Sequence, residues 1–259
     1  MNDFKTKSKE WPWGLEGARI VFKEEIFNAT STGREGEFQF FEVPIDTPIR
    51  ITAYGAQGGM DEDGGGEPGG KGAKISGVFK LEKGTILKIL VGQMGTDGDG
   101  VGGGGGATHV AIDNRDETYT ELISAGGGGA GGAYEGGHGK AELSDDDSGD
   151  GGCSGATGSA GFRGNGSGDN TAYSFINGGV GASGSNGGGS GGFGGGGASQ
   201  SDSSGVSTSD DFGSGGGYQG RYSPCNDPSE GGYSYNDGSD QDNQSGVNEG
   251  HGKVIIERA

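Results

Sequence analysis

Short segments rich in apolar, β-branched and aromatic residues occupy the first half of the chain and its last residues. In one of them Ile49, Ile51 and Ala53 alternate with polar residues, the period of two expected of half-buried β-strands. Gly, Pro or Asp turn residues separate the segments, and no segment carries a helical stripe. The pattern predicts strands over 18–27, 37–44, 49–57, 71–84, 85–93, 107–113, 120–127 and 253–259.

The strand expected at 253–259 stands alone behind a long glycine-rich region. A lone apolar strand exposes an unpaired edge unless it joins the earlier sheet, so we expect the glycine-rich region to begin and end on the same body. The chain is therefore predicted to be mainly β, an antiparallel sandwich with a large insertion. Its expected parts are a flexible charged tail at 1–17, the sandwich at 18–127, the glycine-rich region at 128–252 and a closing strand at 253–259.

Glycine accounts for 67 of the 259 residues, and only 28% of the residues are hydrophobic. Ordinary globular domains are roughly 45 to 50% apolar, so a conventional core cannot fill this molecule. Collagen is excluded because the six prolines, at 12, 44, 48, 68, 224 and 228, lie outside the glycine repeat. A disordered linker is the alternative to an ordered structure, since richness in Gly, Ser and Asp is its usual signature.

The spacing of the glycines favours order. Glycine recurs every third residue over 149–164, again over 178–187, and after a shift of one residue over 188–197. Three residues per turn is the period of the left-handed polyproline II helix, whose N–H and C=O groups need partners outside the helix. Glycine lets neighbouring backbones come close enough to supply them. We predict packed polyglycine II helices, with loops at 199–212 and 233–248.

Several motifs carry a family resemblance. In order along the chain they are YGAQGG (54–59), GVFKLEKGTILKILVGQMG (77–95), GGGGGATHVA (102–111), LISAGGGGAGG (122–132), GGFGGGG (191–197) and EGHGKVIIE (249–257). The chain resembles the glycine-rich domain of the anaplastic lymphoma kinase and leukocyte tyrosine kinase receptor ectodomains, and is similar to glycine-rich domains of microbial surface proteins. The resemblance implies a jelly-roll-like sandwich fused to packed polyglycine II helices, in a region that binds small cytokines in the receptors.

Charge narrows the range of partners. The formal net charge is -19 at pH 7, so the molecule repels nucleic acid and anionic membrane surfaces. The chain has no apolar run of membrane-spanning length and no visible signal peptide, and we expect no direct insertion into a membrane. We expect an extracellular or cell-surface location, alone or as a domain of a larger surface protein. Cys153 and Cys225 suit one long-range disulfide, with free thiols as the alternative.

Few residues suggest a catalytic, metal-binding or phosphate-binding role. The acidic residues Asp97, Asp99, Asp145 and Asp147 are candidate calcium ligands, but no cluster completes a twelve-residue calcium loop, and solvated loops are the alternative. GEPGGK at 66–71 approximates a phosphate-binding spacing without its Ser or Thr. His109 is expected to be structural, and no nucleophile or metal-ligand pattern accompanies the histidines. We therefore expect no cofactor, calcium apart, and no enzymatic activity.

Aromatic residues punctuate the glycine-rich region. They either attach this region to the sandwich or stand on its surface as anchors for a ligand, a role in which Tyr is favoured. The candidates for a recognition surface are Phe193, Tyr218, Tyr222, Tyr233 and Tyr235. The leading hypothesis is a non-enzymatic recognition or adhesion module whose rigid scaffold binds a protein or glycan. The alternatives are an ice- or surface-binding protein, for which 153–160 supplies short Ala, Ser and Thr side chains, and a structural spacer of an adhesin or coat.

Overall fold

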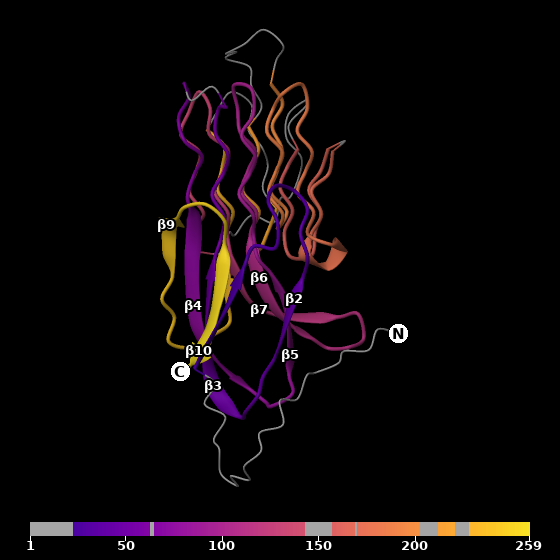
Figure 1. The fold of residues 1–259 in the computed structure, drawn as a ribbon, viewed down its shortest axis with the longest axis vertical. Coiled ribbons are helices and arrows are strands. Elements are labelled where there is room, and N and C mark those ends of the chain that lie inside the picture. Colours follow the sequence, from indigo (N-terminus) through magenta and orange to yellow (C-terminus); the bar gives the residue numbers. More distant parts are fainter. Residues whose placement is uncertain (1–22, 63–64, 143–156, 169, 202–211, 221–227) are drawn as a thin grey trace, which may run out of the picture.

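The computed structural model describes residues 23–62, 65–142, 157–168, 170–201, 212–220 and 228–259. In this part the chain forms ten β-strands, in two antiparallel five-stranded sheets, and one short 3₁₀ helix, η1 (Phe175–Asn177) (Figure 1). The fold is therefore mainly β, as expected. No helix in the described ranges has the length and apolar character needed to cross a membrane. Predictions for the 1–17 tail, Asp145, Asp147, Cys153, Tyr222 and Cys225 fall outside the described residues.

The first sheet contains the closing strand in an interior position. Its strand order is β1-β10-β3-β4-β9, with β1 (Glu24–Asn28), β10 (Lys253–Arg258), β3 (Thr47–Tyr54), β4 (Gly72–Leu81) and β9 (Gln244–Asn248). Ile256 of β10 lies opposite Glu25 on one side and Ile51 on the other. The prediction that 253–259 pairs with the earlier strands is confirmed.

The second sheet contains the strands that lead into the glycine-rich region. Its order is β2-β5-β6-β7-β8, with β2 (Gln39–Glu42), β5 (Ile86–Leu90), β6 (Thr108–Asp113), β7 (Tyr119–Ala125) and β8 (Tyr235–Asn236). Strands β8 and β9 lie within 233–248, where loops were expected. Their polar sequences lack apolar alternation, and their strand geometry comes from backbone pairing with β7 and β4.

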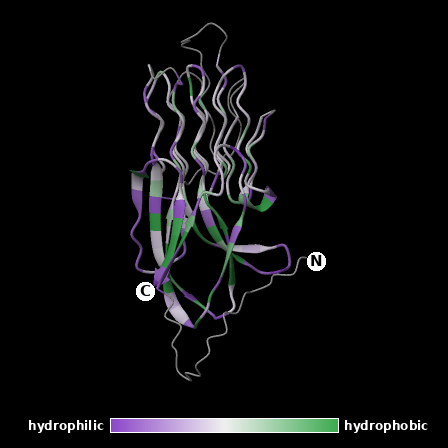
Figure 2. Cartoon of the chain, viewed as in Figure 1, coloured by the Kyte–Doolittle hydropathy of each residue, from purple (hydrophilic) through white to green (hydrophobic). Residues whose placement is uncertain are grey.

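The hydrophobic core consists of strand residues. Ile49, Ile51 and Ala53 are fully buried, as their alternation predicts, and Leu87 and Ile89 of β5 belong to the same cluster. In Figure 2 the hydrophobic colour is concentrated in the strands and η1, while the glycine-rich segments are nearly colourless. Burial of apolar side chains therefore explains the stability of the sandwich but not that of the glycine-rich part.

Glycine-rich segments extend the strands beyond one end of the sandwich and run side by side there (Figure 1). Residues 55–60 follow β3, 66–71 precede β4, 92–97 follow β5, 102–107 precede β6 and 126–131 follow β7. These side-by-side segments form a glycine-rich layer. Residues 55–62, 65–71 and 92–107 belong to it, although the sequence pattern groups them with the sandwich. Segments from later in the chain, at 157–162, 188–199, 213–218 and 229–234, complete the layer.

Backbone hydrogen bonds between segments repeat every third residue. Gly128 donates to Ala56 and accepts from Gly105, each at 2.8 Å. Three residues later, Gly131 donates to Gly59 and accepts from Gly102, so it uses the same two neighbouring segments. Gly127 and Ala130 likewise donate to Gly216 and Gly213, and Gly126 and Gly129 accept from Ala73 and Gly70. One segment is therefore bonded to several neighbours around its axis, in a cycle of three residues.

Close approach explains why these positions are glycine. A Cβ atom at Gly128 would overlap the carbonyl oxygen of Gly70, and one at Gly105 would overlap the carbonyl oxygens of the 56–57 segment. These obstacles are backbone atoms of hydrogen-bonded neighbours, which cannot move aside without breaking the network. The interior of the layer therefore consists largely of packed backbone atoms.

Candidate functional site

Aromatic residues from the glycine-rich part cover the outer face of the second sheet. Phe162, Phe175 and Phe193 are each 1% exposed and form a cluster with Leu90 and Ala111 of the sheet. The rings of Phe162 and Phe175 stack with centroids 4.7 Å apart. These side chains attach the glycine-rich layer to the sandwich, which is the alternative role that the sequence left open for them.

The expectation that Phe193 belongs to a recognition surface is therefore corrected. Its ring packs edge-on against that of Phe38, with centroids 6.1 Å apart, and a Cβ atom at Gly36 would collide with it. Since Phe193 is buried in this contact, it cannot meet a ligand from solution.

Three of the predicted tyrosines lie half-buried at the surface. Tyr218 stacks on Tyr235 with ring centroids 4.7 Å apart and an interplanar angle of 16°. Tyr233 lies under the ammonium of Lys140, 4.4 Å from Nζ to the ring centroid, and its hydroxyl accepts a hydrogen bond from Nζ at 3.0 Å. The structure thus brings Tyr218 and Tyr235 together and gives Tyr233 a separate partner.

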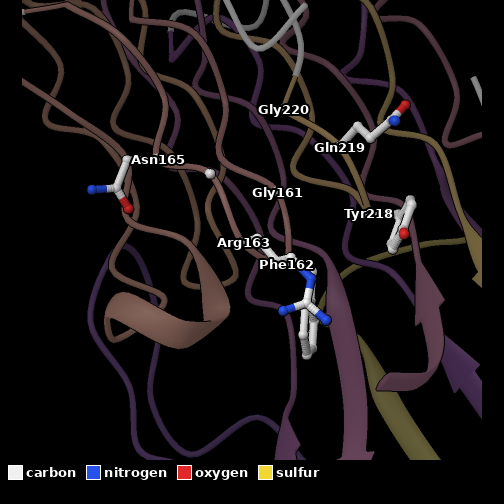
Figure 3. Close-up of a pocket in the computed structure, with 8 residues that line it drawn as sticks. Gly161, Phe162, Arg163, Asn165, Tyr218, Gln219 and Gly220 are labelled. Carbon is white, nitrogen blue, oxygen red and sulfur yellow. The ribbon is translucent and has the colours of Figure 1, made fainter. Parts of the chain in front are cut away.

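A hollow of about 200 Å³ opens beside Tyr218, between the 161–165 turn and the 218–220 segment. Figure 3 shows Phe162 and Arg163 on one side, Tyr218 and Gln219 on the other, and Asn165 at its margin. The two walls are joined where the N–H of Phe162 donates to the carbonyl oxygen of Tyr218 at 2.8 Å. The hollow therefore combines aromatic, amide and cationic groups on a fixed backbone.

The groups around the turn are held in place. The guanidinium carbon of Arg163 lies 5.5 Å from the Phe162 ring centroid, within the range of a cation–π contact. Asn165 accepts hydrogen bonds at Oδ1 from the backbone N–H of Ser174 and from Nδ2 of Asn177, both at 2.9 Å. Asn165 thereby ties the turn to η1, while the Arg163 side chain remains exposed.

A buried polar cluster lies in the second sheet beneath these rings. Oγ of Ser124 is 2.6 Å from Nδ1 of His109 and donates to Oε1 of Glu121. Burial raises the pKa of the Glu121 carboxyl, while hydrogen bonding and charge from His109, and the nearby charge of Arg163, act in the opposite direction. His109 packs edge-on against Phe162 and Phe175, with centroids 5.7 and 5.6 Å away.

This Ser, His and Glu arrangement differs from a catalytic triad. In a triad, one ring nitrogen faces the serine and the other faces the carboxylate. Here Nδ1 of His109 faces both Ser124 and Glu121, and the serine donates directly to the carboxylate. His109 and Ser124 are 1% and 0% exposed, so the cluster is part of the packed junction, as expected for His109.

A lysine surrounded by aromatic rings lies further along the same face. Nζ of Lys88 lies 3.9 Å from the Phe38 ring centroid and 4.1 Å from that of Tyr119, and donates to the Tyr119 hydroxyl at 3.0 Å. Phe40 is directly opposite Lys88 in the strand register and is 54% exposed. The candidates predicted from the sequence include neither this group nor Arg163. The aromatic group around Lys88 did have a signal in the sequence. It is FQFF at 38–41, whose apolar residues point to both faces of a strand.

The calcium candidates in the described ranges make structural contacts. Oδ1 of Asp97 accepts a hydrogen bond from the N–H of Met60 at 2.9 Å, and the backbone N–H of Asp99 donates to the carbonyl oxygen of Gly187. Across the residues that the structure describes, no three His, Cys, Asp or Glu side chains gather in a way that could hold a metal ion. Calcium binding therefore stays a prediction.

Of the segment 153–160, proposed for an ice-binding face, the structure describes residues 157–160. Thr157, Ser159 and Ala160 are at most 2% exposed, so they form no accessible face. Ala160 instead packs with Ala172, Ala182 and Ala198 in a small buried cluster. A scan against protein-family models finds no match for this chain.

Proposed function

We propose that this protein is a non-enzymatic recognition module, in which packed polyglycine II helices and a jelly-roll-like sandwich hold a rigid ligand-binding surface. The proposal includes membership in the type of glycine-rich domain that the motifs resemble. The observation that carries it is the three-residue cycle of hydrogen-bond partners along 126–131. A helix with three residues per turn presents each third residue to the same neighbour, which is this pattern.

Two further observations favour polyglycine II geometry. None of the glycines in 126–132 has a positive φ, as a left-handed extended helix with φ near −75° requires. The neighbouring segments approach so closely that Cβ atoms would overlap backbone atoms at most glycines of this stretch. A single such helix has no internal hydrogen bonds, so order depends on the whole bundle.

Rigidity is what makes this scaffold suitable for recognition. A layer fixed by backbone hydrogen bonds loses little conformational entropy when a ligand binds, and preorganisation of this kind increases affinity. We define the junction surface as the outward residues where the glycine-rich layer meets the second sheet: Phe40, Lys88, Tyr119, Arg163, Asn165, Ile176 and Tyr218. Ring contacts from Phe38 through Phe175 to Phe162 connect its two ends.

The junction surface has the composition of a binding surface. Phe40 and Ile176 are 54% and 41% exposed, and aromatic and arginine residues are enriched at the centres of interfaces. Lys88 and Arg163 place two cations here in a chain that carries 18 basic and 37 acidic residues. We propose a protein or glycan as the ligand and an extracellular or cell-surface setting, in which the chain acts alone or within a larger surface protein.

The test compares variants on an array of glycans and extracellular proteins. Phe40→Ser should abolish saturable binding, because it removes an exposed anchor without opening the core. Val247→Ser is the matched control, since Val247 is 45% exposed on β9 of the other sheet. Binding by the control with loss in Phe40→Ser, at equal melting temperatures, supports the proposal. Absence of any saturable ligand, or equal binding by both variants, contradicts it.

A further inference from the structure

The glycine-rich region contains three asparagines that are each followed by glycine, at positions 165, 177 and 186. In such a pair the backbone nitrogen of the glycine can attack the asparagine side chain, because glycine has no side chain to block the approach. We propose that Asn186, rather than Asn165 or Asn177, is a site of spontaneous deamidation in the folded protein. Asn186 lies outside the junction surface, so this inference is independent of the proposed function.

The reaction needs only water and the two residues of the pair. The backbone nitrogen of Gly187 forms a bond to Cγ of Asn186, and the side-chain amide leaves as ammonia after taking up the proton of the glycine nitrogen. Water then opens the cyclic imide at either of its carbonyl groups, which gives an aspartyl or an isoaspartyl residue in place of Asn186. Hydroxide promotes the first step by removing the N–H proton, so the rate rises with pH.

Hydrogen bonding of the asparagine side chains distinguishes the three sites, whereas exposure does not, since all three asparagines are exposed. Oδ1 of Asn165 accepts hydrogen bonds from the N–H of Ser174 and from Nδ2 of Asn177, both at 2.9 Å. Nδ2 of Asn177 also donates to Oγ of Ser174 at 2.9 Å. Within the described ranges, the side chain of Asn186 has no hydrogen-bond partner, so it is free to rotate toward the backbone.

The N–H groups of the three following glycines differ in the same way. The N–H of Gly166 donates to the carbonyl oxygen of Ala172 at 2.9 Å, and that of Gly178 donates to the carbonyl oxygen of Phe175 at 3.4 Å. The N–H of Gly187 has no acceptor among the residues that the structure describes. The attacking nitrogen is therefore free of hydrogen bonds only at the third site.

A tight turn explains why this site is left free. Asn186 and Gly187 have φ values of 52° and 95°, and the N–H of Gly188 donates to the carbonyl oxygen of Ser185 at 2.9 Å. Positive φ at both central residues is the mark of a type I′ turn, for which Asn followed by Gly is the preferred sequence. The turn hydrogen bond joins the two outer residues, so the N–H between the central residues is not used.

Deamidation would change the contact between this turn and Asp99. The N–H of Asp99 donates to the carbonyl oxygen of Gly187 at 2.9 Å, and a Cβ atom at Gly187 would lie 3.1 Å from Cβ of Asp99. Conversion of Asn186 adds a negative charge at the residue next to this contact, and like charges repel. The isoaspartyl form also lengthens the backbone by one carbon inside the turn. We therefore expect weaker hydrogen bonds from Asp99 and Gly188 after conversion.

The experiment incubates the whole folded chain at mildly alkaline pH and measures conversion at each asparagine by peptide mapping with mass spectrometry. We expect Asn186 to convert about tenfold or more faster than Asn165 or Asn177, because each hydrogen bond that must first break slows the reaction by a factor of about two to ten. The control is the same incubation in urea, which removes these hydrogen bonds and should make the three rates similar.

A second measurement follows the consequence for the turn. In the incubated protein, amide exchange measured by NMR should be faster at Asp99 and Gly188 than in fresh protein. Asn186→Gln is the matched control, since its longer side chain cyclises poorly and its exchange rates should not change on incubation.

Three results would overturn the inference. The first is conversion of Asn165 or Asn177 as fast as that of Asn186 in the folded protein. The second is an intact Asn186 over a period in which the protein in urea converts. The third is the same ratio of rates in urea, which would assign the preference to local sequence instead of the fold. Absence of any saturable ligand, in contrast, would contradict the proposed function and leave this inference standing.

Discussion

The backbone N–H of Gly128 donates a 2.8 Å hydrogen bond to the carbonyl oxygen of Ala56. Ala56 follows β3 of the first sheet and Gly128 follows β7 of the second, so the bond joins extensions of both sheets above the sandwich. No side chain takes part in it. The same kind of contact recurs across the layer, which explains how a chain with 28% hydrophobic residues can fold.

Gly128→Ala should destabilise the protein strongly. The new methyl group would overlap the carbonyl oxygen of Gly70, and the two segments cannot separate without losing hydrogen bonds. We expect a loss of about 3 kcal/mol or more in the free energy of unfolding, measured by urea denaturation. Gly65→Ala is the control, because the nearest atom to its added Cβ is 3.8 Å away. Equal destabilisation by the two substitutions would contradict tight packing at Gly128.

Phe175→Ala should loosen the junction between the glycine-rich layer and the sandwich. Phe175 is 1% exposed and contacts Phe162, Phe38 and Tyr119. Truncation of a buried phenylalanine costs about 3 to 5 kcal/mol, which thermal unfolding would report as a large fall in melting temperature. Ile176→Ala changes the adjacent residue of η1, which is 41% exposed, and should cost about 1 kcal/mol or less. If Ile176→Ala were the more damaging, the described junction would be incorrect.

Glu121→Gln should change how stability depends on pH. Burial raises the pKa of Glu121 in the folded protein, so folding favours the protonated form. This contribution is fully present below the pKa of the unfolded chain and is lost as pH rises through the folded-state pKa. The melting temperature of the Gln variant minus that of the unaltered protein should therefore become more positive between pH 4 and pH 8.

The control for this pH series is Glu82→Gln at an exposed position, which also removes one negative charge. At pH 8 Glu121→Gln should raise the melting temperature more than Glu82→Gln does, because only Glu121→Gln removes a buried charge. If the melting temperature of Glu121→Gln minus that of the unaltered protein fell with rising pH, this would mean that His109 and Ser124 hold the carboxylate in its charged form.

The strands were predictable where burial imposes a period of two. Ile49, Ile51 and Ala53 alternate in the sequence and are buried in β3 as expected. Strand β9 could not be found in this way, because its sequence QSGVN has no apolar alternation and its form depends on pairing with β4. Period-three spacing, in turn, indicated order but not which segments are neighbours, since that depends on contacts far apart in the chain.

The candidate site was harder to predict than the fold. Side chains between glycines follow no alternation, so sequence alone could not distinguish the buried Phe193 from the half-buried Tyr218. Arg163 and Lys88 were missed because their significance depends on the rings beside them. Phe38, Phe40 and Phe41 did carry a signal, since apolar residues on both faces of a strand mean that something lies against each face.

The most direct test of the central claim is amide hydrogen exchange measured by NMR on the whole chain. The N–H groups of Gly128, Gly129 and Gly131 are bonded to neighbouring segments at 2.8 to 2.9 Å. If these segments form one ordered, hydrogen-bonded layer, their amides should exchange as slowly as those of Ile51 and Ile123 in the core strands. Exchange at the rate of an unstructured chain, while Ile51 and Ile123 stay protected, would show that the layer is not ordered.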